Sequence, residues 1–302
     1  MIPGKDISQQ SHSLESVTLS AVGTELQVRK QSPRPSQRFL AAIEKQRRFQ
    51  PISLSGLRVA AVPILNVSRG DAGEVSMVMP YVHGLSGADF ALHGTREMAA
   101  DISKCLNAIL MNEMASTRMV ELQSALLLEK MESVLASSCR ASLQEPLRAA
   151  ATRLQALLSG SETLLFPAGD CHGDLTLSNV ILSHSKGLLL IDFLDSFLES
   201  PLQDVAKIRQ DLVYGWSFRK LDSHLWIKGM LFATKATPTY LSYLESLFPV
   251  LSEALDILCL ARIAPYVRDE PTENWLTGAL RKCLTLTRYS GKVGKGALPT
   301  TP

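Results

Sequence analysis

The feature that most constrains the fold is a short His-Gly-Asp segment that ends at Asp174, set among apolar runs in the second half of the chain. Asn179 follows after four intervening residues, and two apolar runs then lead to Asp192. Gly187 lies between these two runs, where it favours a hairpin turn. A tight loop followed by a hairpin would bring the side chains of Asp174, Asn179 and Asp192 together.

These three side chains suit phosphoryl transfer. One carboxylate can orient an attacking hydroxyl group and accept its proton, while an amide and a second carboxylate can hold Mg²⁺ against nucleotide phosphates. A lone His-Gly-Asp is most often a turn, and Ile-Asp-Phe alone is a common strand end. The interpretation therefore depends on finding both motifs in this order, across a hairpin of suitable length.

The pattern H-G-D-x-x-x-x-N, followed by a strand and I-D-F, resembles the catalytic signature of the aminoglycoside phosphotransferase and choline kinase superfamily of small-molecule kinases. The resemblance implies an α+β, two-lobed protein kinase-like fold, with a small β-rich N-terminal lobe and a larger, mainly helical C-terminal lobe. It implies that Asp174 is the catalytic base and that Asn179 and Asp192 are magnesium ligands. His172 would be a scaffold residue, and Asp204, in a D-x-A-K run, would brace the catalytic loop.

The distribution of apolar residues agrees with two lobes. Runs rich in Leu, Ala, Met, Glu and Lys between residues 97 and 158, and helical periodicity from 202 to 288, predict a helical second lobe. We therefore predict a nucleotide-binding lobe over residues 1–83, a catalytic and acceptor-binding lobe over 84–289, and a disordered tail over 290–302.

Short apolar runs predict the strands. One helix is expected in the first lobe, after two prolines that follow the second strand. The predicted strands cover residues 14–19, 25–31, 57–65 and 74–79 in the first lobe, and 164–166, 180–182 and 188–191 in the second.

A kinase-like lobe needs a strand lysine and a glutamate on the following helix to hold nucleotide phosphates. Lys30 and Arg29 are neighbours on a predicted strand, so only one of them can face the cleft. The family pattern favours Lys30, with Glu44 on the helix as its partner. The alternatives are a solvated strand end for Lys30 and an exposed helical position for Glu44.

Two further segments are candidates for nucleotide contact. The chain lacks G-x-G-x-x-G before its first strands, and Ser11 and Ser13 lie instead in a polar turn whose amides and hydroxyls can bind phosphate. An ordinary N-terminal turn would look the same. Residues 78–82 resemble the segment that links the lobes, where Pro80 would offer its carbonyl and Val82 its amide to adenine. An edge strand that ends at proline fits the same residues.

Three residues are candidates for the acceptor side. Asp195 can bind Mg²⁺ indirectly or hold an acceptor hydroxyl, or it can cap the helix that begins near Pro201. Trp216 can face a quaternary ammonium or a sugar ring, with core packing as the alternative. Arg262 can bind an anionic or hydroxylated group, or form a structural ion pair. Basic residues after Pro201 offset much of the acidic charge, which disfavours a polycationic aminoglycoside.

The overall charge excludes some partner classes. The chain of 302 residues has 31 Lys and Arg against 29 Asp and Glu, which predicts no nucleic-acid or membrane partner. Its cysteines form no C-x-x-C pair, and no signal peptide or transmembrane run is evident, so we expect a cytoplasmic protein with reduced thiols.

Together these features predict an ATP- and Mg²⁺-dependent phosphotransferase that acts on a hydroxyl group of a small metabolite. A sugar or polyol is the first choice of acceptor, and choline or another amino alcohol is the second. A protein acceptor ranks third because the chain lacks the A-P-E element of protein kinases. A catalytically silent, nucleotide-binding module is the alternative from another class.

Overall fold

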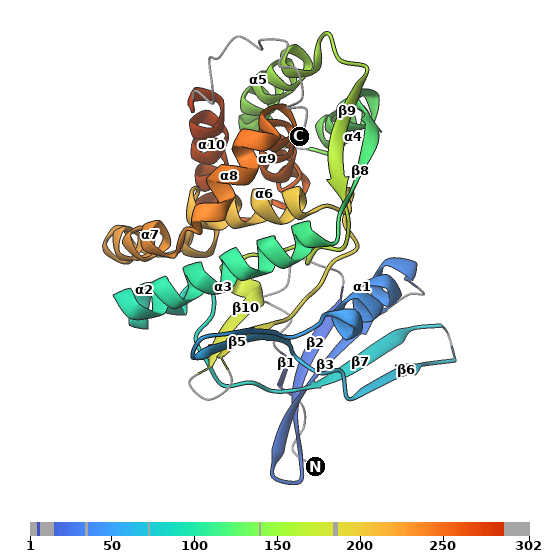
Figure 1. The fold of residues 1–302 in the computed structure, drawn as a ribbon, viewed down its shortest axis with the longest axis vertical. Helices are drawn as coiled ribbons and strands as arrows, with labels where there is room; N and C mark the ends of the chain where they lie inside the picture. Colours follow the sequence, from blue (N-terminus) through green and yellow to red (C-terminus); the bar gives the residue numbers. More distant parts are fainter. Residues whose placement is uncertain are drawn as a thin grey trace, which may run out of the picture.

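The structure is a computed structural model that describes residues 5–6, 15–33, 36–71, 73–138, 140–183 and 187–286. It has a β-rich N-terminal region and a mainly helical C-terminal region, which confirms the predicted fold class (Figure 1). In the view of Figure 1 the two larger sheets lie below and most helices lie above, with helix α3 (Arg96–Ala115) between them.

The first sheet has five antiparallel strands in the order β1-β2-β3-β7-β6. Helix α1 (Gln37–Arg48) covers it and buries Phe39 and Ile43 in a small apolar cluster. Ser36 caps this helix, because its hydroxyl accepts a hydrogen bond from the Phe39 amide at 3.2 Å. The strands are β1 (Lys5–Asp6), β2 (Ser16–Val22), β3 (Glu25–Ser32), β6 (Asn66–Arg69) and β7 (Val75–Pro80).

The second sheet has the order β10-β11-β5-β4 and joins segments that are far apart in the sequence. β5 pairs with β11 in parallel, so strands from both sides of the predicted boundary at residue 83 share this sheet. The prediction of one strand over residues 57–65 is wrong, because β5 ends at Ala61 and β6 then joins the other sheet. The strands are β4 (Ile52–Leu54), β5 (Leu57–Ala61), β10 (Val180–Ser183) and β11 (Gly187–Leu190).

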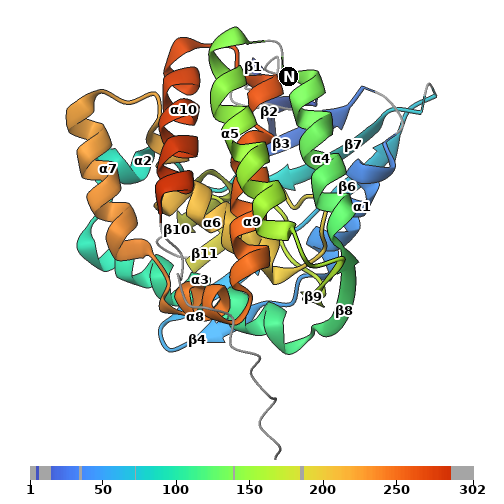
Figure 2. The ribbon, with the colours of Figure 1, turned by 90° about the horizontal axis from the view of Figure 1, so that it is seen from above.

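The helical region differs from the sequence prediction at one place. Strand β8 (Arg118–Gln123) interrupts the run predicted as helical from 97 to 158, because it pairs with β9 (Thr163–Ala168) in a two-stranded sheet. Figure 2 shows α4, α5, α9 and α10 side by side in this region. The remaining helices are α2 (Asp89–His93), α4 (Ser124–Ser137), α5 (Ala141–Leu158), α6 (Pro201–Leu212), α7 (Ser223–Ala236), α8 (Thr239–Leu247), α9 (Pro249–Ala261) and α10 (Glu270–Thr285).

Strand β11 connects the two apolar cores. Leu188 and Leu190 are buried in the large core of the helical region, while Leu189 between them is buried in the small cluster under α1. The strand therefore ends, just before Asp192, at the junction of the two regions. In the described part of the chain, no helix is long and apolar enough to cross a membrane.

Candidate active site

The predicted catalytic loop and hairpin bring Asp174 and Asn179 into direct contact. The Asn179 side-chain amide donates to the main-chain oxygen and to Oδ2 of Asp174, both at 2.8 Å. The main-chain oxygen of Asn179 accepts from the Ile191 amide at 3.0 Å, which ties the loop to the end of the hairpin. The contact of Asp174 with Asn179 is the one that the spacing of the motif predicts, whereas the Asp192 carboxylate contacts Lys30.

Helix α6 supports the loop with three side chains on one face, at positions i, i+3 and i+7. Asp204 accepts hydrogen bonds from the amides of His172 and Gly173, as its predicted bracing position requires. Lys207 places its ammonium nitrogen 2.9 Å from Oδ1 of Asp174. Asp211 accepts from the Leu177 amide at 2.6 Å. Sequence reasoning missed the contacts of Lys207 and Asp211, although their spacing from Asp204 is the signal that would have placed them on this face.

Asp174 is held as a carboxylate. Burial raises its pKa, but the Lys207 charge and the hydrogen bonds from Lys207 and Asn179 outweigh burial, and the pKa falls below its ordinary value. The side chain remains 31% exposed. An ionised, accessible carboxylate at this position can accept a proton from a bound hydroxyl group.

His172 has the geometry of a scaffold residue. Its Nδ1 accepts from the Asp174 amide at 3.2 Å, and its Nε2 lies 2.8 Å from the Ile191 oxygen. Burial lowers the pKa of the imidazole despite the neighbouring carboxylates, so the neutral ring donates from Nε2. Both ring nitrogens are thereby used by the backbone, and the ring also packs on Phe193 at a centroid distance of 4.3 Å.

Asp192 forms an ion pair with Lys30, next to the point where Ile191 is bonded to the catalytic loop. Lys30 Nζ lies 2.7 Å from Oδ1 of Asp192 and 2.7 Å from Oε2 of Glu15. Burial lowers the pKa of Lys30, but the two carboxylates raise it above its ordinary value and keep the ammonium charged. Asp192 has a left-handed backbone with φ of 60°, an uncommon conformation for a non-glycine residue that is concentrated at functional sites.

The expected pair of Lys30 with Glu44 is not formed. Glu44 follows Ile43 by one position on α1, so it points to the outer face, where it is 58% exposed and pairs with Arg47 at 2.9 Å. Glu15, just before β2, is the carboxylate from the first sheet that contacts Lys30. Sequence reasoning missed Glu15, which has no motif to mark it.

Helix α1 instead contributes a lysine to the loop after Asp192. Lys45 is buried and its Nζ lies 2.7 Å from Oε2 of Glu199 and 2.7 Å from the Leu194 oxygen. Burial lowers the pKa of Lys45, but neighbouring anionic groups outweigh it and the pKa is raised. This contact fixes the position of α1 relative to the segment between Asp192 and α6.

The linking segment keeps the features proposed for adenine contact. Pro80 ends β7, and the Tyr81 amide donates to the Leu26 oxygen at 2.9 Å. The Val82 amide has no hydrogen-bond acceptor among the described residues, so it is available to a ligand. Ser11 and Ser13, predicted to contact phosphate, lie outside the described residues.

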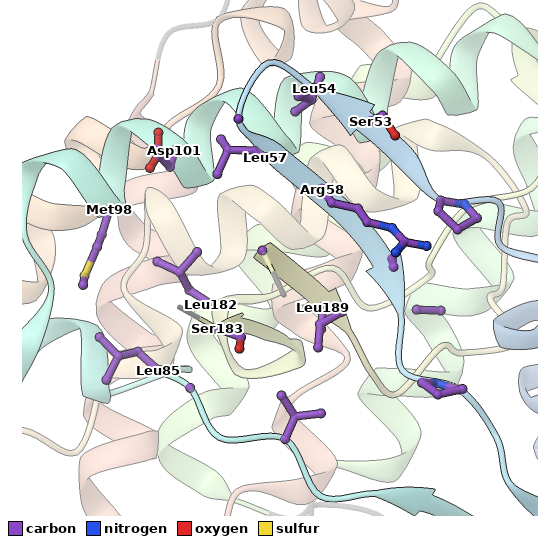
Figure 3. A pocket seen from close by; sticks show the side chains of 18 of the residues that line it. Ser53, Leu54, Leu57, Arg58, Leu85, Met98, Asp101, Leu182, Ser183 and Leu189 are labelled. Atoms are coloured by element: carbon purple, nitrogen blue, oxygen red, sulfur yellow. The ribbon is translucent and has the colours of Figure 1, made fainter. Parts of the chain in front are cut away.

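A cavity of about 1170 Å³ lies between the β4–β5 hairpin, β10–β11 and the segment after β7 (Figure 3). Leu57, Leu189 and Leu85 line it, together with the charged side chains of Arg58 and Asp101. Its lining includes Pro80 and Val82 but none of the residues of the catalytic loop. The cavity therefore adjoins the linking segment but is separate from the site around Asp174.

The three acceptor-side candidates have different surroundings. Asp195 does not cap α6, because Ser200 is the N-cap; Asp195 lies instead 3.8 Å from the Arg38 side chain. Trp216 has the Arg219 guanidinium stacked on its face, 3.5 Å from the ring centroid, and Trp275 at its edge. Arg262 follows the last residue of α9 and is half-buried.

The donors at the end of the hairpin suit Mg²⁺. Asp192 offers a carboxylate oxygen and Asn179 an amide oxygen, both hard ligands. Among the described residues there is no cluster of three or more His, Cys, Asp or Glu that could hold a metal. Mg²⁺ commonly binds few protein ligands, with water and phosphate completing its shell.

The comparisons with known proteins agree with this geometry. The model of the phosphotransferase enzyme family matches residues 17–241. Among solved structures, a thermostable mutant of aminoglycoside phosphotransferase APH(4)-Ia in its apo form has a TM-score of 0.60 and 11% identity over 93% of both chains.

Two other structures have the same fold at low identity. Choline kinase LicA from Streptococcus pneumoniae has a TM-score of 0.51 and 16% identity over 89% of both chains. A glucosamine kinase in complex with glucosamine, ADP and inorganic phosphate has a TM-score of 0.53 and 16% identity, over 94% of this chain and 79% of its own. No curated protein matches the sequence. The family match covers well over half of the chain, which therefore belongs to the phosphotransferase enzyme family.

Proposed function

We propose that this protein transfers the γ-phosphoryl group of ATP to a hydroxyl group of a small metabolite, with Asp174 as the base. The observation that carries the proposal is the position of Asp174, ionised between Lys207 and Asn179. Nucleotide use is supported by family membership and by neighbours crystallised with nucleotides, among them the glucosamine kinase with ADP.

In this mechanism the chain supplies positioning and charge. Asp174 orients the acceptor hydroxyl and takes its proton as the oxygen attacks the γ-phosphorus. Lys30, charged and in contact with Glu15 and Asp192, would neutralise the nucleotide phosphates. Asp192 and Asn179 would hold Mg²⁺, which would supply further positive charge to the phosphates. Val82 and Pro80 would bind adenine through main-chain groups.

The acceptor is best sought among sugars and polyols. An aromatic cage for choline is disfavoured because the Arg219 guanidinium already covers a face of Trp216 and would repel a quaternary ammonium. Tyr214, on the segment just before Trp216, is buried and hydrogen-bonded to Asp256 at 3.0 Å. Neither Trp216 nor Tyr214 is therefore well suited to face a cation.

The test is Mg²⁺-ATP turnover on a panel of sugars, polyols and amino alcohols, with the phosphorylated product identified by mass. We expect ADP and phosphorylated acceptor to form in equal amounts. Tight nucleotide binding without transfer to any acceptor would instead favour the catalytically silent module.

A further inference from the structure

Two half-buried cations near the proposed site have no carboxylate partner. Lys130 lies on α4 and Arg262 directly follows α9. In the described part of the chain, neither side chain makes an ion pair or a hydrogen bond, and the only contact of the Lys130 ammonium is the Phe197 ring, 5.6 Å from the centroid. Removing a cation from water without a partner costs free energy, and an anionic ligand would offset that cost.

Several other buried or half-buried cations among the described residues are paired with carboxylates. Lys45 contacts Glu199 and Arg209 contacts Asp256, each at 2.7 Å, and Arg140 contacts Glu273. In these places the fold supplies a carboxylate to a cation that serves structure. The structural ion pair that remained an alternative for Arg262 is not formed.

Helix α4, which carries Lys130, packs against α9, which ends directly before Arg262, and the charges of the two side chains act on each other. Burial lowers the pKa of Lys130, and the charges of Arg262 and Arg38 lower it further. The charge of Arg262 also acts on Lys207, which holds Asp174. Two neighbouring positive charges without a carboxylate partner attract an anion.

Packing links this pair of cations to the catalytic loop. On α9, one turn before Arg262, Cys259 Sγ lies 3.1 Å from Oε1 of Gln210, and the same oxygen accepts from Lys207 Nζ at 3.1 Å. Phe197, beneath Lys130, belongs to the segment between Asp192 and α6. The carboxylates on this segment have other partners: Asp195 lies 3.8 Å from the Arg38 side chain, and Glu199 pairs with Lys45.

We propose that Lys130 and Arg262 bind an anionic group of the acceptor, so that the acceptor is a hydroxy acid or a phosphorylated polyol. The inference rests on the proposed function and narrows its acceptor class. The anion holds the acceptor while one of its hydroxyls faces Asp174. The hydroxyl oxygen then forms a bond to the γ-phosphorus, the bond from that phosphorus to ADP breaks, and the hydroxyl proton passes to Asp174.

The experiment compares acceptors that share a carbon chain and differ in charge. Glycerol, glycerate and glycerol 3-phosphate form one set, and glucose, gluconate and glucose 6-phosphate form another; ethanolamine is the cationic member. We expect kcat/KM to be about tenfold or more higher for an anionic member than for its neutral counterpart. Comparing carboxylates with phosphate esters shows which anion is recognised. Equal or higher activity on neutral or cationic members would overturn the proposal.

Substitutions of the two cations test whether these side chains bind the anionic group of the acceptor. Lys130→Met and Arg262→Gln remove charge but keep most of the side-chain volume, and each should raise KM for the anionic acceptor about tenfold while kcat changes little. Lys104→Met is the matched control, because Lys104 is 67% exposed and pairs with Asp101 on α3. Unchanged KM in both Lys130→Met and Arg262→Gln would contradict the assignment.

A binding measurement tests the anion site independently of the proposed phosphoryl transfer. With saturating Mg²⁺-ADP, glycerate and inorganic phosphate are titrated by calorimetry into the wild type, Arg262→Gln and Asp174→Asn. Anion binding that is lost in Arg262→Gln but kept in Asp174→Asn supports the anion site, even if no acceptor is phosphorylated and the proposed function fails. Phosphorylation of a neutral acceptor without anion binding would refute the anion site and leave the proposed function standing.

Discussion

Lys207 contacts the carboxylate of Asp174 from helix α6, with 2.9 Å between Nζ and Oδ1. Asp204 and Asp211, on the same face of this helix, bind the backbone on either side of that carboxylate. One helix thus fixes the shape of the catalytic loop and also sets the charge of the proposed base.

Replacing Lys207 with methionine should move the acidic limb of the pH profile of kcat/KM to higher pH. The lysine holds the pKa of Asp174 below its ordinary value; without it, burial dominates and the pKa rises. Activity would then be lost at a higher pH as the solution is acidified. Profiles from pH 4 to 8 at constant Mg²⁺ test this, with Lys207→Arg as the charge-conserving control. Superimposable profiles for the wild type and Lys207→Met would refute the role of Lys207.

Glu113 on α3 gives a prediction about stability. It is buried against Asp204, and burial and the Asp204 charge raise its pKa well above the ordinary value. The folded state therefore retains a proton that the unfolded state loses. The stabilisation is complete below the unfolded pKa of about 4.5 and is lost as pH rises toward the folded pKa.

The Glu113→Gln variant removes this titration but keeps a hydrogen-bond donor. Above pH 4.5 the wild-type free energy of unfolding should fall with a slope of up to about 1.4 kcal/mol per pH unit from this group, and the variant should lack that component. Urea unfolding between pH 5 and 8 measures it. Glu132→Gln, on an exposed position of α4, is the control. Parallel pH dependences in the wild type and Glu113→Gln would contradict the assignment.

The Lys45–Glu199 pair should stabilise the junction of the two regions. Lys45→Met removes the ammonium donor to Glu199 and to the Leu194 oxygen, which keep only Ser196 and weaker donors, and we expect a loss of about 2–3 kcal/mol in the free energy of unfolding. The double variant with Glu199→Gln should be less destabilised than the sum of the single variants, by about 1 kcal/mol. Strict additivity in urea unfolding would show that the two side chains are not coupled.

The sequence predicted the parts of the site that are close together along the chain. Four residues separate Asp174 from Asn179, so local geometry nearly determines the contact between these two side chains. Alternation along β3 correctly separated Lys30 from the exposed Arg29. Such short-range relations follow from turn chemistry and the strand period.

Contacts between distant segments were not predictable in the same way. The partner of Lys30 depends on the rotation of α1, which turns Glu44 outward and leaves Glu15 in its place. The pairing that holds β5 in the second sheet depends on β11, more than a hundred residues later. Both outcomes are set by packing among elements, for which periodicity within one element gives no signal.

The most direct test of Asp174 as the catalytic base is the rate of phosphoryl transfer in the Asp174→Asn variant. The asparagine keeps the size of the side chain but cannot take a proton, so kcat should fall about 10²–10⁴-fold while the Kd for Mg²⁺-ATP changes by less than about threefold. Single-turnover transfer from ATP to the best acceptor, measured beside nucleotide binding by calorimetry, gives both values. A kcat within a few-fold of the wild type would contradict the assignment of Asp174 as the base.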